Sequence, residues 1–227
     1  MTQWSDKIFD IYLFAGVATG PNMFQECRIE LDRRHRGQEN SVVAGEFFPY
    51  GFHEESLVKQ VWQVRRDMLS RKHGSGVQEA ASYIKERLPG RRKLLLIGHS
   101  GGGIAAYRTA VQLRRWGTKT EFHIIQVGSP KMRFAEELRK QITYIVAVDE
   151  QGKEIDRVAR LGSWGGWSKG RNGLPYWNKH KHAPGRIETI TLIGGHPHYF
   201  CSSEKYVHPE RGSNLALTLD AIWGGFA

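Results

Sequence analysis

Six short stretches of almost uninterrupted apolar residues alternate along the chain with longer stretches that have helical spacing. Apolar runs of this length, rich in Ile, Val, Leu, Phe and Tyr, are typical of strands that are buried on both faces of a sheet. The predicted strands are 8–15, 41–48, 93–97, 122–127, 142–148 and 187–193.

Helical spacing is clearest where Val77, Ala80, Ala81, Ile84 and Leu88 recur on one face and the pattern stops before a Pro-Gly pair. Further helices are predicted at 24–36, 55–70, 104–116, 132–140 and 214–223. Alternation of buried strands and amphipathic helices predicts an α/β fold, a single doubly wound and mostly parallel sheet of about six strands with helices on both faces. A length of 227 residues predicts one domain, residues 1–227, whose ligands bind beyond the carboxyl ends of the strands.

Composition narrows the classes of protein. The chain has 33 Lys and Arg against 23 Asp and Glu, a net charge of +10 that attracts anionic partners. Cys27 and Cys201 lie in no C-x-x-C pair, which excludes a disulfide scaffold and a thiolate zinc site. Because no apolar run reaches about 18 residues, we expect no transmembrane segment and no export signal, and therefore a cytoplasmic location.

A G-x-S-x-G motif stands where the predicted strand 93–97 ends and the helix 104–116 begins, with Ser100 between Gly98 and Gly102. Such a turn lifts a serine hydroxyl above the sheet edge, and the two glycines avoid collisions with neighbouring backbone. The backbone N–H of Gly101 can then donate to an oxyanion at the helix N-terminus. The alternative, a phosphate-binding turn, lacks the following Lys-Ser/Thr pair that it would need.

A serine nucleophile needs a base and an acid, and in this architecture they follow it in the order acid, then histidine. His196 and His198 both come directly after the last predicted strand. For the acid, Asp149 directly follows the strand 142–148 and Asp156 comes seven residues later; spacing alone slightly favours Asp149.

Three motifs in order resemble the class 3 lipase pattern of the α/β-hydrolase superfamily: Gly-His-Ser-Gly-Gly at 98–102, Val-Gly-Ser-Pro at 127–130 with Phe-Ala at 134–135, and Asp-Arg-Val-Ala-Arg-Leu at 156–161. The resemblance covers roughly residues 93–200. It implies that Asp156 is the catalytic acid, because the family's acid opens the third motif. Many hydrolases of this superfamily close with His-x-x-Tyr-Phe, which matches 196–200 and implies His196 as the base. The residue after the nucleophile is Gly101, where the superfamily has a bulkier one, and the substrate class stays open.

The loop after the first strand should supply the second oxyanion donor, for which we expect the N–H of Val17, with Ala18 as the second choice. The long irregular segment 157–186 is rich in Trp, Gly and basic residues, and it lies between the proposed acid and base. We expect Trp164 and Trp167 to contact substrate there, as a lid or collar. The basic residues of the segment favour an anionic head group; they are Lys169, Arg171, Lys179 and Lys181.

Two function hypotheses follow. The first is a serine hydrolase that cleaves a carboxylic ester, with lipase, esterase, thioesterase or acyltransferase variants, acting on a small-molecule or lipid ester. The second is a basic binding module for nucleic acid or phospholipid without turnover, although we do not expect nucleic acid as the partner. No cofactor is expected, and no metal, since the pairs His180/His182 and His196/His198 have no carboxylate cluster beside them. The oligomeric state stays open.

Overall fold

The computed structural model describes residues 9–35, 41–52, 54–69, 74–88 and 93–224. In this part of the chain, one parallel sheet has the strand order β2-β1-β3-β4-β5-β8. Its strands are β1 (Phe9–Phe14), β2 (Ser41–Phe47), β3 (Lys93–His99), β4 (Phe122–Val127), β5 (Ile142–Val148) and β8 (Arg186–Thr191). All six predicted strands are present, and the predicted α/β architecture is correct; the predicted start at Ile8 lies outside the described residues.

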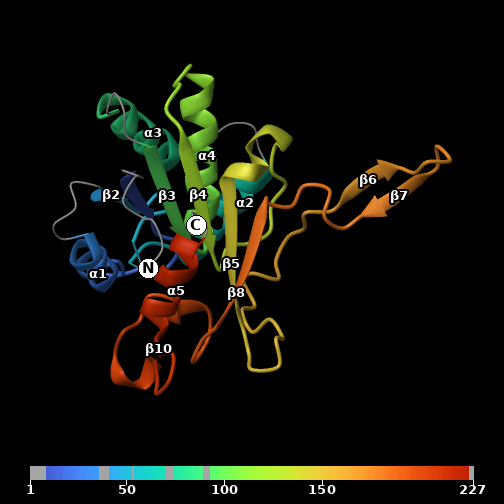
Figure 1. Ribbon diagram of the computed structural model, residues 1–227. Helices are drawn as coiled ribbons and strands as arrows, with labels where there is room; N and C mark the ends of the chain where they lie inside the picture. The colour runs from blue at the N-terminus through green and yellow to red at the C-terminus, as the bar shows by residue number, and fades with distance from the viewer. Residues whose placement is uncertain (1–8, 36–40, 53, 70–73, 89–92, 225–227) are drawn as a thin grey trace.

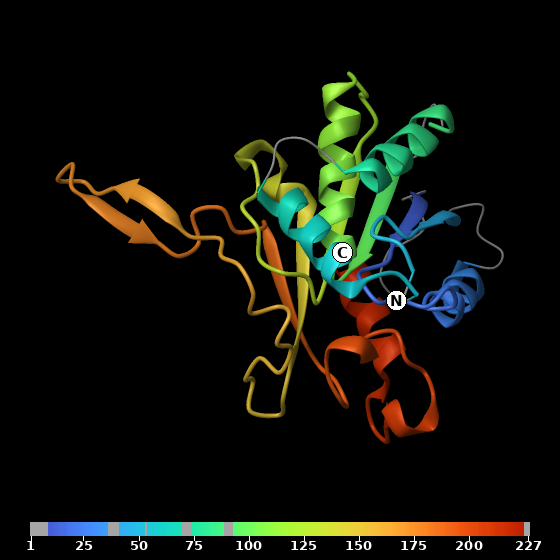
Figure 2. The ribbon, with the colours of Figure 1, turned by 180° about the vertical axis from the view of Figure 1, so that it is seen from behind.

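Helices cover both faces of this sheet (Figure 1 and Figure 2). They are α1 (Gln25–His35), α2 (Leu57–Leu69), α3 (Ser75–Glu86), α4 (Gly101–Arg115) and α5 (Asn214–Gly224). One apolar cluster joins the sheet to α2, α3 and α4, and a second joins it to α1 and α5. The predicted helix ends at Arg36 and Ser70 lie outside the described residues.

The central strand β3 shows why its sequence is apolar throughout. Leu94 and Leu96 belong to the first cluster, and Leu95 and Ile97 belong to the second. Because alternate side chains point to opposite faces, a strand with helices on both sides needs apolar residues at every position. The same packing holds the carboxyl end of β3, where Ser100 follows, in the middle of the sheet edge.

Two predictions for the connecting segments were wrong. The predicted helix 132–140 is only a 3-10 helix, η1 (Glu136–Gln141), because residues 132–135 have no regular structure and bury Met132 and Phe134, two residues apart. The segment 157–186 is not irregular throughout: it contains an antiparallel hairpin of β6 (Gly166–Lys169) and β7 (Pro175–Asn178). This hairpin, which we call the arm, projects away from the sheet (Figure 1 and Figure 2).

Short elements complete the carboxyl-terminal region. They are η2 (His196–His198), η3 (Glu204–Tyr206), β9 (Val207–His208) and β10 (Gly212–Ser213). Among the residues described, no helix combines the length and the apolar character needed to cross a bilayer.

Candidate active site

Ser100 stands on a sharp turn between β3 and α4. Its backbone has φ 56° and ψ −131°, a left-handed conformation that is costly for a residue with a side chain. A Cβ at Gly98 would lie 2.3 Å from the carbonyl oxygen of Gly102, and a Cβ at Gly102 would lie 2.0 Å from the carbonyl oxygen of Phe14. The two glycines therefore allow strand, turn and helix to pack closely enough to present the serine, as expected of this motif.

The loop after β1 passes directly beside Ser100. A Cβ at Gly16 would lie 2.6 Å from the Cβ of Ser100, so only glycine permits this approach. The N–H of Ala18 is already used, because it donates to Oε1 of Gln60 at 2.7 Å. Within the described residues, the N–H groups of Val17 and Gly101 donate to no other group, and both residues line the pocket above Ser100.

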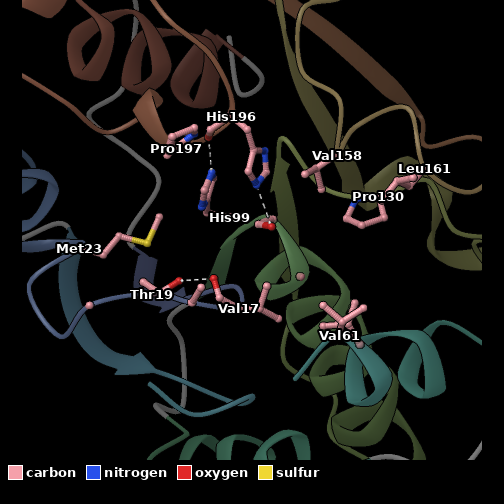
Figure 3. Close-up of a pocket in the computed structure, with 15 residues that line it drawn as sticks. Val17, Thr19, Met23, Val61, His99, Pro130, Val158, Leu161, His196 and Pro197 are labelled. Carbon is pink, nitrogen blue, oxygen red and sulfur yellow. Dashed lines mark hydrogen bonds between the residues drawn. The ribbon is translucent and has the colours of Figure 1, made fainter. Parts of the chain in front are cut away.

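Ser100, His196 and Asp156 form one chain of hydrogen bonds. Nε2 of His196 lies 2.9 Å from Oγ of Ser100 (Figure 3). Nδ1 of His196 lies 2.9 Å from Oδ2 of Asp156. Since a carboxylate only accepts, Nδ1 carries the proton and Nε2 is the acceptor for the serine hydroxyl. The structure thus places the three predicted residues in the arrangement in which a serine can be activated.

Asp156 is completely buried and has four hydrogen bonds. Oδ1 accepts from the N–H groups of Val158 and Ala159, and Oδ2 accepts from His196 and from the hydroxyl of Tyr199 at 2.8 Å. Burial by itself raises the pKa of Asp156, but the hydrogen bond and charge of His196 and the other donors outweigh it. The pKa of Asp156 is therefore below its ordinary value, and the group is ionised at neutral pH.

The alternative acid and base have structural surroundings of their own. Oδ1 of Asp149 accepts from the backbone N–H groups of Gln151 and Lys153, so this carboxylate organises the turn after β5. Nδ1 of His198 accepts from the N–H of Gly195, and its ring stacks on Tyr206 with centroids 4.4 Å apart. Neither side chain takes part in the hydrogen-bond chain to Ser100.

A second histidine, His99, lies beside the first. The rings of His99 and His196 are stacked with centroids 4.8 Å apart, and Nε2 of His99 donates to the backbone oxygen of His196 at 2.9 Å. Burial, and to a smaller extent the neighbouring His196, lowers the pKa of His99 to about 3. His99 is therefore a neutral support for the backbone that carries His196.

The pocket above Ser100 has a volume of about 530 Å³ and mostly apolar walls (Figure 3). Its apolar side chains are Val17, Ala18, Met23, Val61, Val64, Pro130, Val158, Leu161 and Pro197. Neither predicted substrate contact, Trp164 or Trp167, lines it. Trp164 is instead buried edge-on against Tyr144, and Trp167 lies exposed on the arm against Trp177. Of the 157–186 segment, only its beginning, at Val158 and Leu161, lines the pocket.

Sequence reasoning missed two supporting residues. Gln60 is fully buried, and its side chain bridges the N–H of Ala18 and the carbonyl oxygen of Phe52. The signal was a polar residue on the buried stripe of α2, where Gln60, Val64 and Asp67 recur at helical spacing. Tyr199 belongs to the His-x-x-Tyr-Phe motif, which assigns it no role, but its hydroxyl joins the carboxylate of Asp156 to the N–H of Ala147.

The described part of the chain contains no group of three or more His, Cys, Asp or Glu side chains that could hold a metal ion. His180 and His182 lie after the arm, where His182 has Arg133, Lys181 and Arg139 as charged neighbours. Cationic neighbours of this kind disfavour a bound cation.

Comparison with known proteins gives similarity at the level of structure only. No protein-family model matches the sequence, and no curated protein matches it either. Among solved structures, RedJ, a thioesterase from the prodiginine biosynthetic pathway in Streptomyces coelicolor, is similar over 84% of this chain and 80% of its own, with 15% identity and a TM-score of 0.46. ClbQ from the colibactin NRPS/PKS pathway is similar over 84% of this chain and 90% of its own, with 11% identity and a TM-score of 0.47. YbtT, a type II thioesterase from the yersiniabactin NRPS/PKS pathway, is similar over 87% and 89%, with 9% identity and a TM-score of 0.43.

Proposed function

We propose that this protein is a serine hydrolase that cleaves carboxylic esters, or thioesters, through an acyl-enzyme on Ser100. The observation that carries the proposal is the continuous hydrogen-bond chain from Ser100 through His196 to the buried Asp156, at the floor of an apolar pocket. A serine hydroxyl is a weak nucleophile near neutral pH, and this chain supplies the base and the orientation that it needs.

In the first half of the reaction, Oγ of Ser100 attacks the carbonyl carbon while its proton passes to Nε2 of His196. The carboxylate of Asp156 stabilises the imidazolium that forms and keeps the ring in the required tautomer. The carbonyl oxygen becomes an oxyanion, for which the N–H groups of Val17 and Gly101 are the available donors. Each preorganised donor of this kind contributes about 3 to 4 kcal/mol to the transition state.

In the second half, His196 gives its proton to the leaving alkoxide or thiolate, and the acyl group stays on Ser100. Water then attacks the acyl-enzyme with His196 as the base, releasing a carboxylic acid and restoring the serine. An alcohol or amine acceptor in place of water would make the same site an acyltransferase.

The walls of the pocket favour an apolar acyl chain. Val61 and Leu161, both more than half exposed, line the pocket together with Met23 and Val158. The lipase-like motifs at 98–102, 127–130 and 156–161 support an ester substrate, although they do not distinguish an ester from a thioester. We propose a substrate whose acyl part is longer than acetyl.

Fluorophosphonate labelling of the folded protein tests this proposal. We expect one covalent adduct in the wild type, none in Ser100→Ala, and an unchanged adduct in the control Ser168→Ala on the arm. Hydrolysis of p-nitrophenyl esters from acetyl to lauroyl should depend on Ser100 and increase with chain length. Absence of labelling in folded wild-type protein would refute the hydrolase and favour a binding module for an anionic partner.

A further inference from the structure

A second cavity adjoins the pocket of the proposed active site. This cleft, of about 1110 Å³, is bounded by the end of α2, by α4, by the segment after β4 and by the base of the arm. Its basic side chains are Arg108, Lys131, Arg133, Arg139 and Lys181, with His182 among them, and Glu136 is its one acidic residue. We call it the cationic cleft.

Three segments of the chain pass from one cavity into the other. Pro130 lines the pocket and Lys131 lines the cleft; Leu161 lines the pocket and Gly162 lines the cleft. On α2, Val64 faces the pocket and Met68, one turn further, faces the cleft. The two cavities therefore lie next to each other, with mostly apolar walls in the pocket at Ser100 and basic side chains in the cleft.

Two guanidinium groups of the cleft are held by backbone carbonyl oxygens, and neither forms an ion pair within the described residues, although the carboxylate of Asp67 acts electrostatically on Arg108. Arg139 donates to the backbone oxygens of Ala183 at 2.5 Å and of Lys181 at 3.0 Å. Arg108 donates to the backbone oxygens of Asp67 and Met68. Carbonyl oxygens hold a guanidinium but leave it with its positive charge and further N–H donors, which is the state in which arginine recognises an anion.

The remaining basic groups differ in how they are paired. Lys131 has a carboxylate partner, Glu154, at 3.4 Å. The ammonium group of Lys181 donates to the backbone oxygen of Trp167. The guanidinium of Arg133 has neither a hydrogen bond nor an ion pair within the described residues. Its freedom makes Arg133 the side chain best able to move onto a ligand.

The positive charge of these groups affects the ionisation of His182 inside the cleft. The pKa of His182 is below its ordinary value because of burial first and then because of the positive charges of Arg133, Lys181 and Arg139. A positive field in a concave, partly desolvated site attracts anions and strengthens their hydrogen bonds.

We propose that the cationic cleft binds a phosphate-bearing part of the same substrate whose acyl chain occupies the pocket at Ser100. This inference rests on the proposed function and names the substrate class: an apolar acyl group joined through its ester or thioester to an alcohol or thiol that carries phosphate. Several cations spread over one cleft match the several oxygens of phosphate better than a single carboxylate. The source can be a lipid head group or a free phosphorylated thiol, since both present the same chemistry.

Binding measurements test the cleft without any need for turnover. Decyl phosphate carries an apolar chain and a phosphate, and decanol is its uncharged counterpart. We expect calorimetric titration to show tighter binding of decyl phosphate to the wild type, and roughly tenfold weaker binding to Arg133→Gln, the effect of losing one charge-assisted contact. The control Lys119→Gln removes the same charge at an exposed position outside the cleft and should bind like the wild type. Equal binding of decyl phosphate by wild type, Arg133→Gln and Lys181→Gln would overturn the proposal.

Kinetic measurements identify the source of the phosphate. The ratio of kcat/KM for lauroyl coenzyme A to that for p-nitrophenyl laurate should fall about tenfold in Arg133→Gln, if the source is a free phosphorylated thiol. The same loss seen only with a phosphatidylglycerol in mixed micelles would assign the cleft to a lipid head group. A ratio that Arg133→Gln leaves unchanged for both substrates, in an enzyme that labels at Ser100, refutes the cleft but not the hydrolase. Decyl phosphate binding that depends on Arg133, in a protein that hydrolyses nothing, supports the anion site and refutes the hydrolase.

Discussion

The turn at Ser100 and the arm at 166–178 are both rich in glycine, but the turn is buried among other segments and the arm is exposed. Every residue from Leu94 to Ala106 is buried, and a Cβ at either Gly98 or Gly102 would collide with a backbone carbonyl oxygen. On the arm, Trp167, Leu174 and Trp177 are exposed, and a Cβ at Gly173 would meet nothing within 4 Å.

This difference teaches where a strained conformation can persist. The left-handed backbone of Ser100 is held because β1, β3 and α4 surround it, so that other contacts offset its cost. The arm keeps only the local geometry of a hairpin, in which the positive φ of Gly173 costs little. Chemistry that needs a precisely placed hydroxyl belongs to the first kind of region, and substitutions in the two should have different consequences.

The largest expected effect is on activity at the buried edge. Asp156→Asn should lower kcat for ester hydrolysis by about 10⁴-fold, because an amide cannot stabilise the imidazolium and favours the wrong tautomer of His196. Asp149→Asn is the matched control and should keep the activity within about twofold, since Asp149 serves only a turn. Loss of p-nitrophenyl ester hydrolysis in Asp149→Asn with retention in Asp156→Asn would reverse the assignment.

The two tryptophans of the 157–186 segment give the next largest difference. Trp164→Ala should destabilise the protein by about 3 to 5 kcal/mol, because a buried indole that packs on Tyr144 is replaced by a cavity. Trp167→Ala removes a ring that is 64% exposed and should cost less than about 1 kcal/mol. Urea denaturation measures the free energy of unfolding of both variants. Similar losses of stability in the two would contradict the view that Trp164 is part of the core and that Trp167 lies on an exposed arm.

Glycine substitutions compare the two regions directly. Gly102→Ala should cost about 3 kcal/mol, because the new Cβ would lie 2.0 Å from the carbonyl oxygen of Phe14 and would separate α4 from β1. Gly173→Ala has open space and should lose only about 1 kcal/mol through its left-handed backbone. The free energies of unfolding of the two variants, with ester hydrolysis as a second readout, test this difference. Full activity and stability in Gly102→Ala would show that the close contact between Gly102 and Phe14 does not shape the turn.

The sequence was sufficient for the buried region because its signals are local and redundant. The apolar run 94–97, the glycines at 98 and 102 and the helix that follows all indicate one turn, and the structure agrees at each of them. The chain order of acid and histidine left two candidates for each partner of Ser100, two aspartates and two histidines. Spacing alone favoured Asp149 as the acid. The lipase-like motif indicated Asp156, the carboxylate that the structure places against His196.

The rest depended on contacts between distant segments. That Trp164 packs on Tyr144, twenty residues earlier, follows from the path of the chain across β5 and not from its composition. The pocket walls come from α2, from the loop after β1 and from the segment after Asp156, none of which carries a motif for substrate. The strands of the arm are four residues long, too short for alternation to distinguish them from a loop.

The smallest expected effect, when it is measured between about pH 7 and 5, concerns two histidines, His99 at the buried edge and His180 on the exposed chain after the arm. Because the pKa of His99 falls to about 3 on folding, the unfolded chain takes up a proton below its ordinary value of 6.5 and the native protein does not. Stability is therefore full above that value and declines as the pH falls through the range from 6.5 to 3, by about 1.4 kcal/mol per pH unit.

His99→Gln should remove this part of the decline while keeping a donor for the backbone oxygen of His196. Other histidines, His182 and His198 among them, add declines of the same sign, so the difference between wild type and variant isolates His99. Urea denaturation at about pH 7, 6 and 5 measures it, a range that lies above the ordinary pKa of Asp156. His180→Gln is the matched control and should follow the wild type, since that ring is exposed. Parallel curves for wild type and His99→Gln would mean that the native state accommodates a proton on His99, and that the edge beside Ser100 is less tightly closed than its burial indicates.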